Sequence, residues 1–267
     1  MMPQREWRID VETAPTPWIT ALRNSHETLR AAVEPLDDEL LERRSYDADW
    51  SIAQVLSHLG SQSEIFGLFL DAGLSGQDPP GGEVFQPIWD TWNARSAHEQ
   101  AIHALQVDGN LVGRFESLDD EQREHVHLQL FGMELGTTGL ARMRLSEHAI
   151  HTWDVVVALQ PSATVAADAV DLLVDTLDAL VGRCGKPGGH PRKLGVTTTR
   201  PERHFILDIG DTVALLSGEP DASGAHLRLP AEAFVRLVYG RLDPDHTPPV
   251  ETGGDELDAL RKVFPGL

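Results

Sequence analysis

Apolar side chains recur at intervals of three and four residues along the first two thirds of the chain, a pattern typical of amphipathic helices. The expected helices cover residues 18–34, 51–72, 89–105, 138–159 and 165–182. The second of them is expected to begin at Ser51, because Ser51 and Gln54 have the spacing of a capping box. It should end where glycines and prolines cluster in residues 73–82, which favour a loop.

Alternation of polar and apolar residues replaces the helical spacing in two parts of the chain. In residues 125–136 it predicts a short strand or extended segment, with Val126, Leu128 and Leu130 facing one side. Beyond a stretch rich in glycine, proline and basic residues, the expected strands cover 193–199, 203–209, 211–217 and 225–229. Two helices are expected after them, at 231–242 and 255–264.

These elements predict an α+β protein of two domains. The N-terminal domain, residues 12–183, is expected to be a helical bundle, and the C-terminal domain, residues 190–267, a small α+β unit. The glycine-rich and proline-rich segment 184–193 contains the expected boundary between them. A chain of 267 residues is long enough to bury a core in each domain.

Charge and cysteine content narrow the choice of partners. A formal net charge of −20 disfavours binding to nucleic acid or anionic membranes and favours small molecules. Cys184 is the lone cysteine, so an internal disulfide and a site of several thiolates are excluded, and a metal would be held by nitrogen and oxygen. We interpret Cys184 itself as incidental. The opening residues lack the apolar core of a secretory signal, so a cytoplasmic location is expected, and the scarcity of lysine beside arginine is typical of a GC-rich, for example actinobacterial, genome.

Two expected helices carry candidate metal ligands. Glu147 and His151 are four residues apart, which brings their side chains onto one helical face. His58 completes a set of three ligands if its helix lies beside theirs. Two imidazoles and one carboxylate leave a divalent ion with an open position, which is typical of catalytic rather than structural zinc. Asp154 is a candidate acceptor for the second ring N–H of His151, although a solvated or capping aspartate is an equal interpretation.

Each of these features also has an ordinary interpretation. A Glu and a His four residues apart are most often an exposed polar pair, and His58, close to two leucines, has the setting of a half-buried histidine. His148 follows Glu147 directly but points about 100° away on a helix, so it is a poor third ligand. His125 and His127 are interpreted as structural or solvent-facing.

Two segments resemble a known family. D-W-S-I-A-Q-V-L-S-H-L, residues 49–59, and M-R-L-S-E-H-A-I-H-T-W-D-V-V-V-A-L, residues 143–159, are similar to signature segments of the DinB-like superfamily, and specifically of its mycothiol-dependent maleylpyruvate isomerase branch. In that branch a Trp precedes the first metal histidine by eight residues, and a Glu-x-x-x-His-x-x-Asp string supplies the other ligands. The matching residues are Trp50, His58, Glu147, His151 and Asp154.

The resemblance implies a four-helix bundle of the up-down-down-up type that holds one divalent metal. The ligand types favour zinc, although sites of nitrogen and oxygen discriminate poorly between metals, so a purified sample can hold nickel or cobalt instead. The resemblance also implies mycothiol as co-substrate, in a transferase or isomerase whose activated thiol adds to an electrophilic small molecule such as maleylpyruvate. In this family an arginine of the C-terminal domain serves substrate binding. The match is Arg241, in the Gly-Arg pair of the segment L-V-Y-G-R-L, with Arg236 as the alternative.

Two other functions stay open at this point. Water in place of the thiol would give a metal-dependent hydrolase of a small amide or ester, with Glu134 or Asp154 as the base. A metal enclosed by protein atoms would make the chain a non-catalytic binding or stress-response module. Neither the electrophile nor the choice between monomer and homodimer follows from the sequence.

Overall fold

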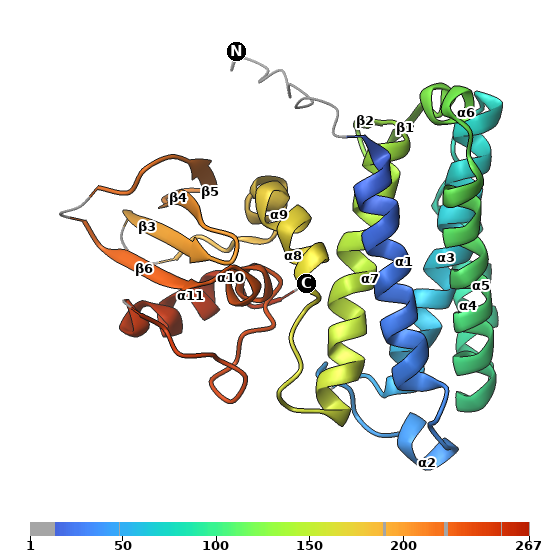
Figure 1. The fold of residues 1–267 in the computed structure, drawn as a ribbon, viewed down its shortest axis with the longest axis horizontal. Coiled ribbons are helices and arrows are strands. Elements are labelled where there is room, and N and C mark those ends of the chain that lie inside the picture. The colour runs from blue at the N-terminus through green and yellow to red at the C-terminus, as the bar shows by residue number, and fades with distance from the viewer. Residues whose placement is uncertain (1–13, 48, 189–190, 222–223, 252, 267) are drawn as a thin grey trace.

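A computed structural model describes residues 14–47, 49–188, 191–221, 224–251 and 253–266. A bundle of long helices stands beside a smaller unit in which helices cover a sheet (Figure 1). The segment 1–13, for which no export signal is expected, lies outside the described residues. Among the described helices, none has both the length and the apolar composition that a membrane crossing requires.

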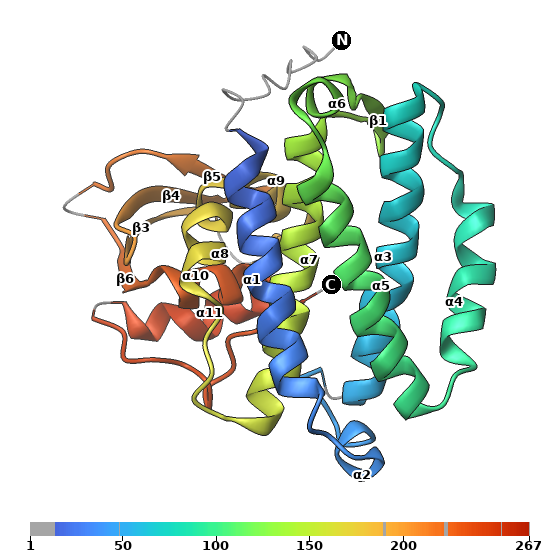
Figure 2. The ribbon, with the colours of Figure 1, turned by 45° about the vertical axis from the view of Figure 1, so that its right-hand side comes forward.

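Four long helices form the bundle: α1 (Pro15–Val33), α3 (Ile52–Ser75), α5 (Ala97–Ser117) and α7 (Thr137–Leu159). Helices α1 and α7 run in one direction, and α3 and α5 run in the other (Figures 1 and 2). Helices α3 and α5 are parallel neighbours because α4 (Phe85–Asn93) returns the chain along α3 before α5 begins. The up-down-down-up bundle expected from the sequence is confirmed.

Capping residues decide where the bundle helices begin. Ser51 caps α3 as expected: its hydroxyl accepts from the Gln54 N–H at 3.2 Å, and the Gln54 side chain accepts from the Ser51 N–H at 2.9 Å. The single helix expected over 89–105 is wrong, because Ser96 and Glu99 form a second capping box that starts α5. The chain therefore turns between α4 and α5. Helix α4 packs closely on α3 at Gly60, where a Cβ atom would lie 2.2 Å from the Trp92 ring.

Short elements lie in the connections between the four long helices. They are α2 (Asp38–Leu41), the 3-10 turn η1 (Gly82–Val84), α6 (Asp120–His125) and the hairpin β1 (Leu128–Leu130) with β2 (Met133–Leu135). The extended segment expected over 125–136 is thus an antiparallel hairpin. Its two turn residues, Phe131 and Gly132, have φ angles of 53° and 78°, the positive values that a tight hairpin turn requires.

The C-terminal unit is built on a four-stranded sheet in the order β5-β4-β3-β6. The strands are β3 (Arg192–Thr199), β4 (Arg203–Ile209), β5 (Val213–Ser217) and β6 (His226–Pro230). Neighbours are antiparallel except β3 and β6, which are parallel. The four expected strands are confirmed, while the helices that follow are shorter than expected: α10 (Ala231–Val238), the 3-10 turn η3 (Gly254–Glu256) and α11 (Leu257–Val263).

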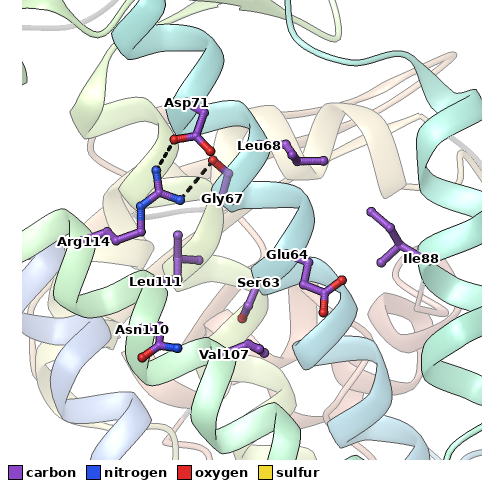
Figure 3. A pocket seen from close by; sticks show the side chains of 10 residues that line it. All are labelled: Ser63, Glu64, Gly67, Leu68, Asp71, Ile88, Val107, Asn110, Leu111 and Arg114. Carbon is purple, nitrogen blue, oxygen red and sulfur yellow. Dashed lines mark hydrogen bonds and ion pairs between the residues drawn. The ribbon is translucent and has the colours of Figure 1, made fainter.

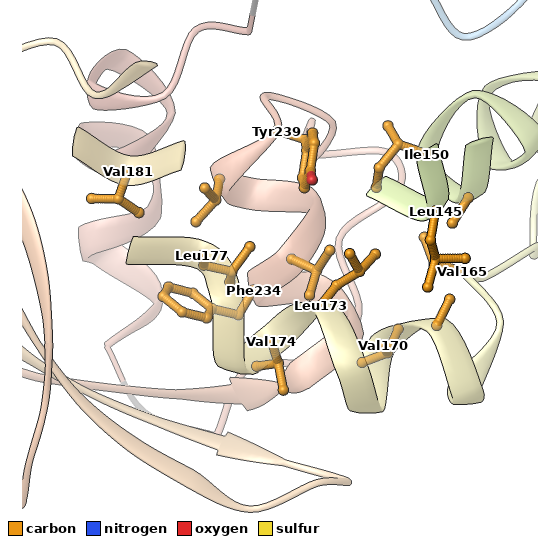
Figure 4. Close-up of a cluster of buried hydrophobic side chains, with 14 of the residues drawn as sticks. Leu145, Ile150, Val165, Val170, Leu173, Val174, Leu177, Val181, Phe234 and Tyr239 are labelled. Atoms are coloured by element: carbon orange, nitrogen blue, oxygen red, sulfur yellow. The ribbon is translucent and has the colours of Figure 1, made fainter. Parts of the chain in front are cut away.

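One continuous apolar core joins the bundle to the C-terminal unit. The helix expected over 165–182 is interrupted and forms α8 (Ala167–Leu173), the 3-10 turn η2 (Val174–Thr176) and α9 (Leu177–Cys184). Leu145 and Ile150 of α7 face this segment on one side, and Phe234 of α10 faces it on the other (Figure 4). The segment therefore bridges the two units, and the division into residues 12–183 and 190–267 stays a prediction.

Candidate metal centre

Helices α3 and α7 bring the three expected ligands to one point in the bundle. The His58 Nε2 atom lies 3.6 Å from Glu147 Oε2, and His151 Nε2 lies 3.7 Å from the same oxygen. One candidate ligand atom of each residue lies within 4.8 Å of the others. His58 and Glu147 are each about a quarter to a third exposed, at 27% and 32% of their side chains, so parts of both side chains face solvent.

The spacing of these atoms fits a metal ion better than it fits hydrogen bonds. Hydrogen bonds to nitrogen and oxygen measure about 2.7–3.2 Å. Ligands about 2.05 Å from a tetrahedral zinc ion stand about 3.4 Å apart, close to the distances of 3.6 and 3.7 Å found here. In addition, His58 Nε2 is buried and has no hydrogen-bond partner. A neutral imidazole has one N–H and one lone pair, so this nitrogen can ligate a metal in the tautomer that carries the proton on Nδ1.

The protonation states of the cluster also suit metal binding. Burial lowers the pKa of His58, so its ring is neutral at neutral pH. Burial alone would raise the pKa of Glu147, but the neighbouring His58, His151 and Gln62 outweigh this and lower the pKa to about 2. The carboxylate is therefore charged and the imidazole of His58 is neutral, which are the forms that bind a divalent cation.

Asp154 lies where the sequence analysis expected it. Its carboxylate is fully buried and takes a hydrogen bond from His151 Nδ1 at 2.9 Å. Because Nδ1 then carries the proton, His151 Nε2 presents its lone pair to Glu147 and His58. The indole of Trp50 lies against both imidazoles, with ring centres 5.1 Å from His58 and 6.2 Å from His151.

Arg241 enters this site from the C-terminal unit. Its Nε and Nη2 atoms each lie 3.3 Å from an oxygen of Asp154, and its Nη1 donates to the Tyr239 carbonyl at 3.0 Å. The turn that places it is a Schellman motif at the end of α10, in which Gly240 has a φ of 71° and the Arg241 N–H bonds to the Arg236 carbonyl at 2.7 Å. Arg241 therefore does not contact the three candidate ligands directly and is joined to one of them, His151, through Asp154.

The other candidates of the sequence analysis lie elsewhere. Arg236 stacks over the Trp153 ring at 4.6 Å and pairs with Glu232, away from the three ligands. Glu134 and His127 are exposed and lie 4.0 Å apart on the hairpin side of the bundle. Cys184 is buried, and burial raises the pKa of its thiol, as suits an unreactive side chain.

A second histidine–carboxylate cluster, missed by the sequence analysis, is buried in the middle of the bundle. Asp108 accepts from His26 Nδ1 at 2.7 Å, from His148 Nε2 at 2.9 Å and from Arg144 Nη2 at 2.7 Å. All three distances are ordinary hydrogen-bond lengths, and the Arg144 guanidinium supplies a positive charge beside the carboxylate. The cluster is thus a hydrogen-bonded network. Arg144 and His148 are four residues apart on α7, but their contacts with Asp108 and His26 depend on two other helices, which no spacing within one segment shows.

Gln62 was missed as well, although it follows His58 by one helical turn on α3. Its Nε2 donates to Glu147 Oε2 at 3.0 Å, and its Oε1 accepts from Arg144 Nη1 at 3.0 Å. The amide therefore connects the buried network to the candidate metal ligand.

A groove between α3, α4 and α5 opens on the other side of α3 (Figure 3). Its polar residues include Glu64, Asp71 and Arg114, and the Arg114 guanidinium is paired with Asp71 and bonded to the Gly67 carbonyl. None of the three candidate ligands lines this groove. The chemistry of the candidate centre therefore lies outside it.

Comparisons with known proteins agree with the resemblance. The chain aligns with the crystal structure of the mycothiol-dependent maleylpyruvate isomerase with a TM-score of 0.66 and 12% sequence identity. The alignment covers 90% of this chain and 94% of that one. A mutant of that enzyme gives the same values. At this identity the match shows the fold alone.

A relative from Geobacillus thermodenitrificans, named "Putative metal-dependent hydrolase", is 39% identical over 69 residues. This stretch is 26% of the present chain and spans only 38% of the relative's length. The family model described as "Mycothiol maleylpyruvate isomerase N-terminal domain" matches residues 22–156, just over half of the chain. This range contains His58, Glu147, His151 and Asp154. The chain therefore belongs to the mycothiol maleylpyruvate isomerase N-terminal domain family.

Proposed function

We propose that this protein is a metal-dependent thiol transferase or isomerase that uses mycothiol and acts on an electrophilic small molecule. The observation that carries the proposal is the convergence of His58, Glu147 and His151 with spacings of 3.6 and 3.7 Å, beside a buried imidazole nitrogen without a partner. Zinc is the ion we propose, since two imidazoles and one carboxylate are a common catalytic zinc set. We propose a cytoplasmic location as well.

Three protein ligands leave a coordination position for another molecule. A divalent ion held there would lower the pKa of a bound thiol and make it a thiolate at neutral pH. His58 and Glu147 supply a neutral ring and a charged carboxylate without losing protons at neutral pH. Asp154 holds the proton of His151 on Nδ1, which leaves Nε2 free to ligate.

The sulfur of mycothiol would then add to an electrophilic carbon of the substrate. In an isomerase, the adduct rotates about the former double bond and expels the thiol, which regenerates the co-substrate. In a transferase, the conjugate leaves as product. Both outcomes need the same activated sulfur, so one ligand set serves either reaction.

We propose that Arg241 binds the substrate from the C-terminal side. Its guanidinium, which is about one-tenth exposed, is held at Asp154, next to His151. A substrate carboxylate attracted to this cation would lie beside the three ligands. Asp47 is a second carboxylate near the Arg241 guanidinium, 4.0 Å from its Nη2 atom.

Thiol-dependent consumption of an electrophile tests the proposal. Purified protein with zinc and mycothiol should consume maleylpyruvate or a halogenated bimane at a rate that saturates with thiol. His58→Ala should abolish this consumption, whereas Ser57→Ala, which removes a hydrogen bond to Asn93 on another face of α3, should retain it. Full activity in His58→Ala would refute the metal mechanism.

A hydrolase is the second candidate, favoured by the name of the Geobacillus relative. Water would take the place of the thiol. Neither expected base is free at the centre, because Asp154 is fully buried and bonded to His151 Nδ1, and Glu134 lies on the exposed hairpin. Turnover of an amide or ester without thiol, at a rate that added mycothiol leaves unchanged, would support the hydrolase over the transferase.

A further inference from the structure

We propose that Gln62 is a positioning residue that holds the Glu147 carboxylate in place for the metal, and that buried Arg144 fixes the orientation of Gln62. The inference rests on the proposed metal centre. It concerns a side chain that is not itself among the three ligands. The hydrogen bonds run from Arg144 to Gln62 and from Gln62 to Glu147, at 3.0 Å each.

Arg144 is an immobile starting point for this chain of contacts. Its side chain is fully buried, and its Nη2 donates to Asp108, to Ser63 and to the Leu59 carbonyl at 2.7, 2.8 and 3.1 Å. Three acceptors on two other helices therefore hold one end of the guanidinium. The planar fork then directs the remaining Nη1 toward Gln62.

The guanidinium determines which way the Gln62 amide points. Arginine has only donors, so the amide atom that meets it must be the oxygen Oε1. The amide nitrogen then necessarily faces Glu147, and it donates to Oε2 at 3.0 Å. The direction of the amide follows from hydrogen-bonding chemistry, because the reversed amide would place two donors against each other.

The oxygen held by Gln62 is the same atom that faces both imidazoles. Glu147 Oε2 lies 3.6 Å from His58 Nε2 and 3.7 Å from His151 Nε2. A carboxylate oxygen has two lone pairs, so it can accept the amide proton and still ligate a cation. Without the amide, a glutamate side chain that is 32% exposed could turn toward solvent. Side chains that hydrogen-bond to a metal ligand commonly contribute about 10–100-fold to metal affinity.

Metal affinity, measured apart from activity, tests the inference. Cobalt(II) is titrated into metal-free wild type, Gln62→Met and Gln62→Ala, and its visible absorption band is followed. Both variants should bind one equivalent with a Kd about 10–100-fold weaker than wild type. Gln100→Met is the matched control, because Gln100 loses one amide hydrogen bond, to the Trp92 carbonyl at 3.2 Å, outside the centre. Its Kd should equal that of wild type.

The outcomes separate this inference from the proposed function. If wild type and His58→Ala show the same cobalt binding, the proposed metal centre fails. If wild type binds cobalt through His58 and both Gln62 variants bind it with unchanged Kd, the positioning role is overturned. Unfolding curves of the metal-free variants identify a loss that comes from misfolding, and the alanine variant avoids the bulk of methionine.

Arg144→Lys tests the role assigned to the guanidinium. Lysine retains the positive charge beside Asp108 but lacks the fork that reaches Gln62. We expect weaker cobalt binding in Arg144→Lys and no additional loss in the double variant with Gln62→Met. Additive losses would show that Arg144 acts on the metal independently of Gln62, and would overturn this part of the proposal.

Discussion

The bundle contains two histidine–carboxylate clusters that share residue types but differ in spacing and exposure. In the His26–Asp108–His148 cluster the atoms are 2.7 and 2.9 Å apart, all three side chains are buried, and protons occupy the spaces between them. In the His58–Glu147–His151 cluster the atoms are 3.6 and 3.7 Å apart, and one ring nitrogen has no partner. The first arrangement stabilises the fold, whereas the second is suited to a cation.

The largest expected effect concerns the buried cluster. Asp108→Asn removes the charge that pairs with buried Arg144, and leaving a buried charge without its partner costs about 3–5 kcal/mol. Glu147→Gln, in contrast, should change the unfolding free energy of the metal-free protein by about 1 kcal/mol or less. Urea unfolding in the presence of a chelator measures both. Equal losses at the two positions would mean that the clusters do not differ as described.

Zinc should stabilise the protein by binding at the His58–Glu147–His151 cluster alone. A free zinc concentration 100 times the Kd adds about 2.7 kcal/mol to the unfolding free energy when the ion binds only the native state. Thermal unfolding of wild type with and without zinc measures the gain, which should vanish in His151→Ala. A gain that persists in His151→Ala would place the ion elsewhere.

Asp154→Asn should weaken zinc binding by about 10–100-fold, because the ring of His151 loses its charged acceptor. Competition with a chromophoric chelator gives the Kd. Asp243→Asn is a matched control, since Asp243 accepts from His246 Nδ1 at the same distance of 2.9 Å but outside the centre. The two substitutions should therefore differ in effect, and similar Kd values for both would rule out a role for Asp154 in metal binding.

The smallest expected effect is a dependence of stability on pH. Burial lowers the pKa of His148 in the native protein, while an unfolded histidine titrates near about 6.5. Just below this pH the unfolded chain binds a proton that the native chain does not, so stability is complete above about pH 6.5 and falls at lower pH. For each such group the unfolding free energy changes by at most about 1.4 kcal/mol per pH unit. His58, whose pKa is also lowered by burial, contributes in the same direction.

Urea unfolding of metal-free protein at a series of pH values measures this slope. The slope should be flatter in His148→Gln than in wild type and unchanged in the exposed control His98→Gln. Identical slopes in all three proteins would contradict a neutral, buried His148.

Local signals in the sequence predict most helices and strands. They do not predict contacts that depend on how separate helices pack. The Ser51 capping box predicts the start of α3. The equivalent box at Ser96 marks the start of α5, but the apolar spacing alone predicts one helix where α4 and α5 form. Glu147 and His151 were recognisable because one helix carries both at a spacing of four residues. Asp108 and His26 were not, since their proximity depends on how separate helices pack.

The same limit applies to the surroundings of the ligands. Gln62 follows His58 by four residues and lies on the same face of α3, so the helical spacing could have indicated it. The role that we propose for Gln62 depends on its hydrogen bond from Arg144 of α7, and no spacing within one segment shows that contact. Arg241 was expected from the resemblance, yet its pairing with Asp154 depends on how the C-terminal unit packs against the bundle.

Anomalous diffraction at the zinc edge, from crystals grown with zinc, tests most directly whether the two clusters differ as described. We expect one peak about 2.0–2.2 Å from His58 Nε2, His151 Nε2 and a Glu147 oxygen, with a further position on the ion open to water or thiol. We expect no peak between His26, Asp108 and His148. A peak within that buried cluster, or none at His58, Glu147 and His151, would contradict the assignment.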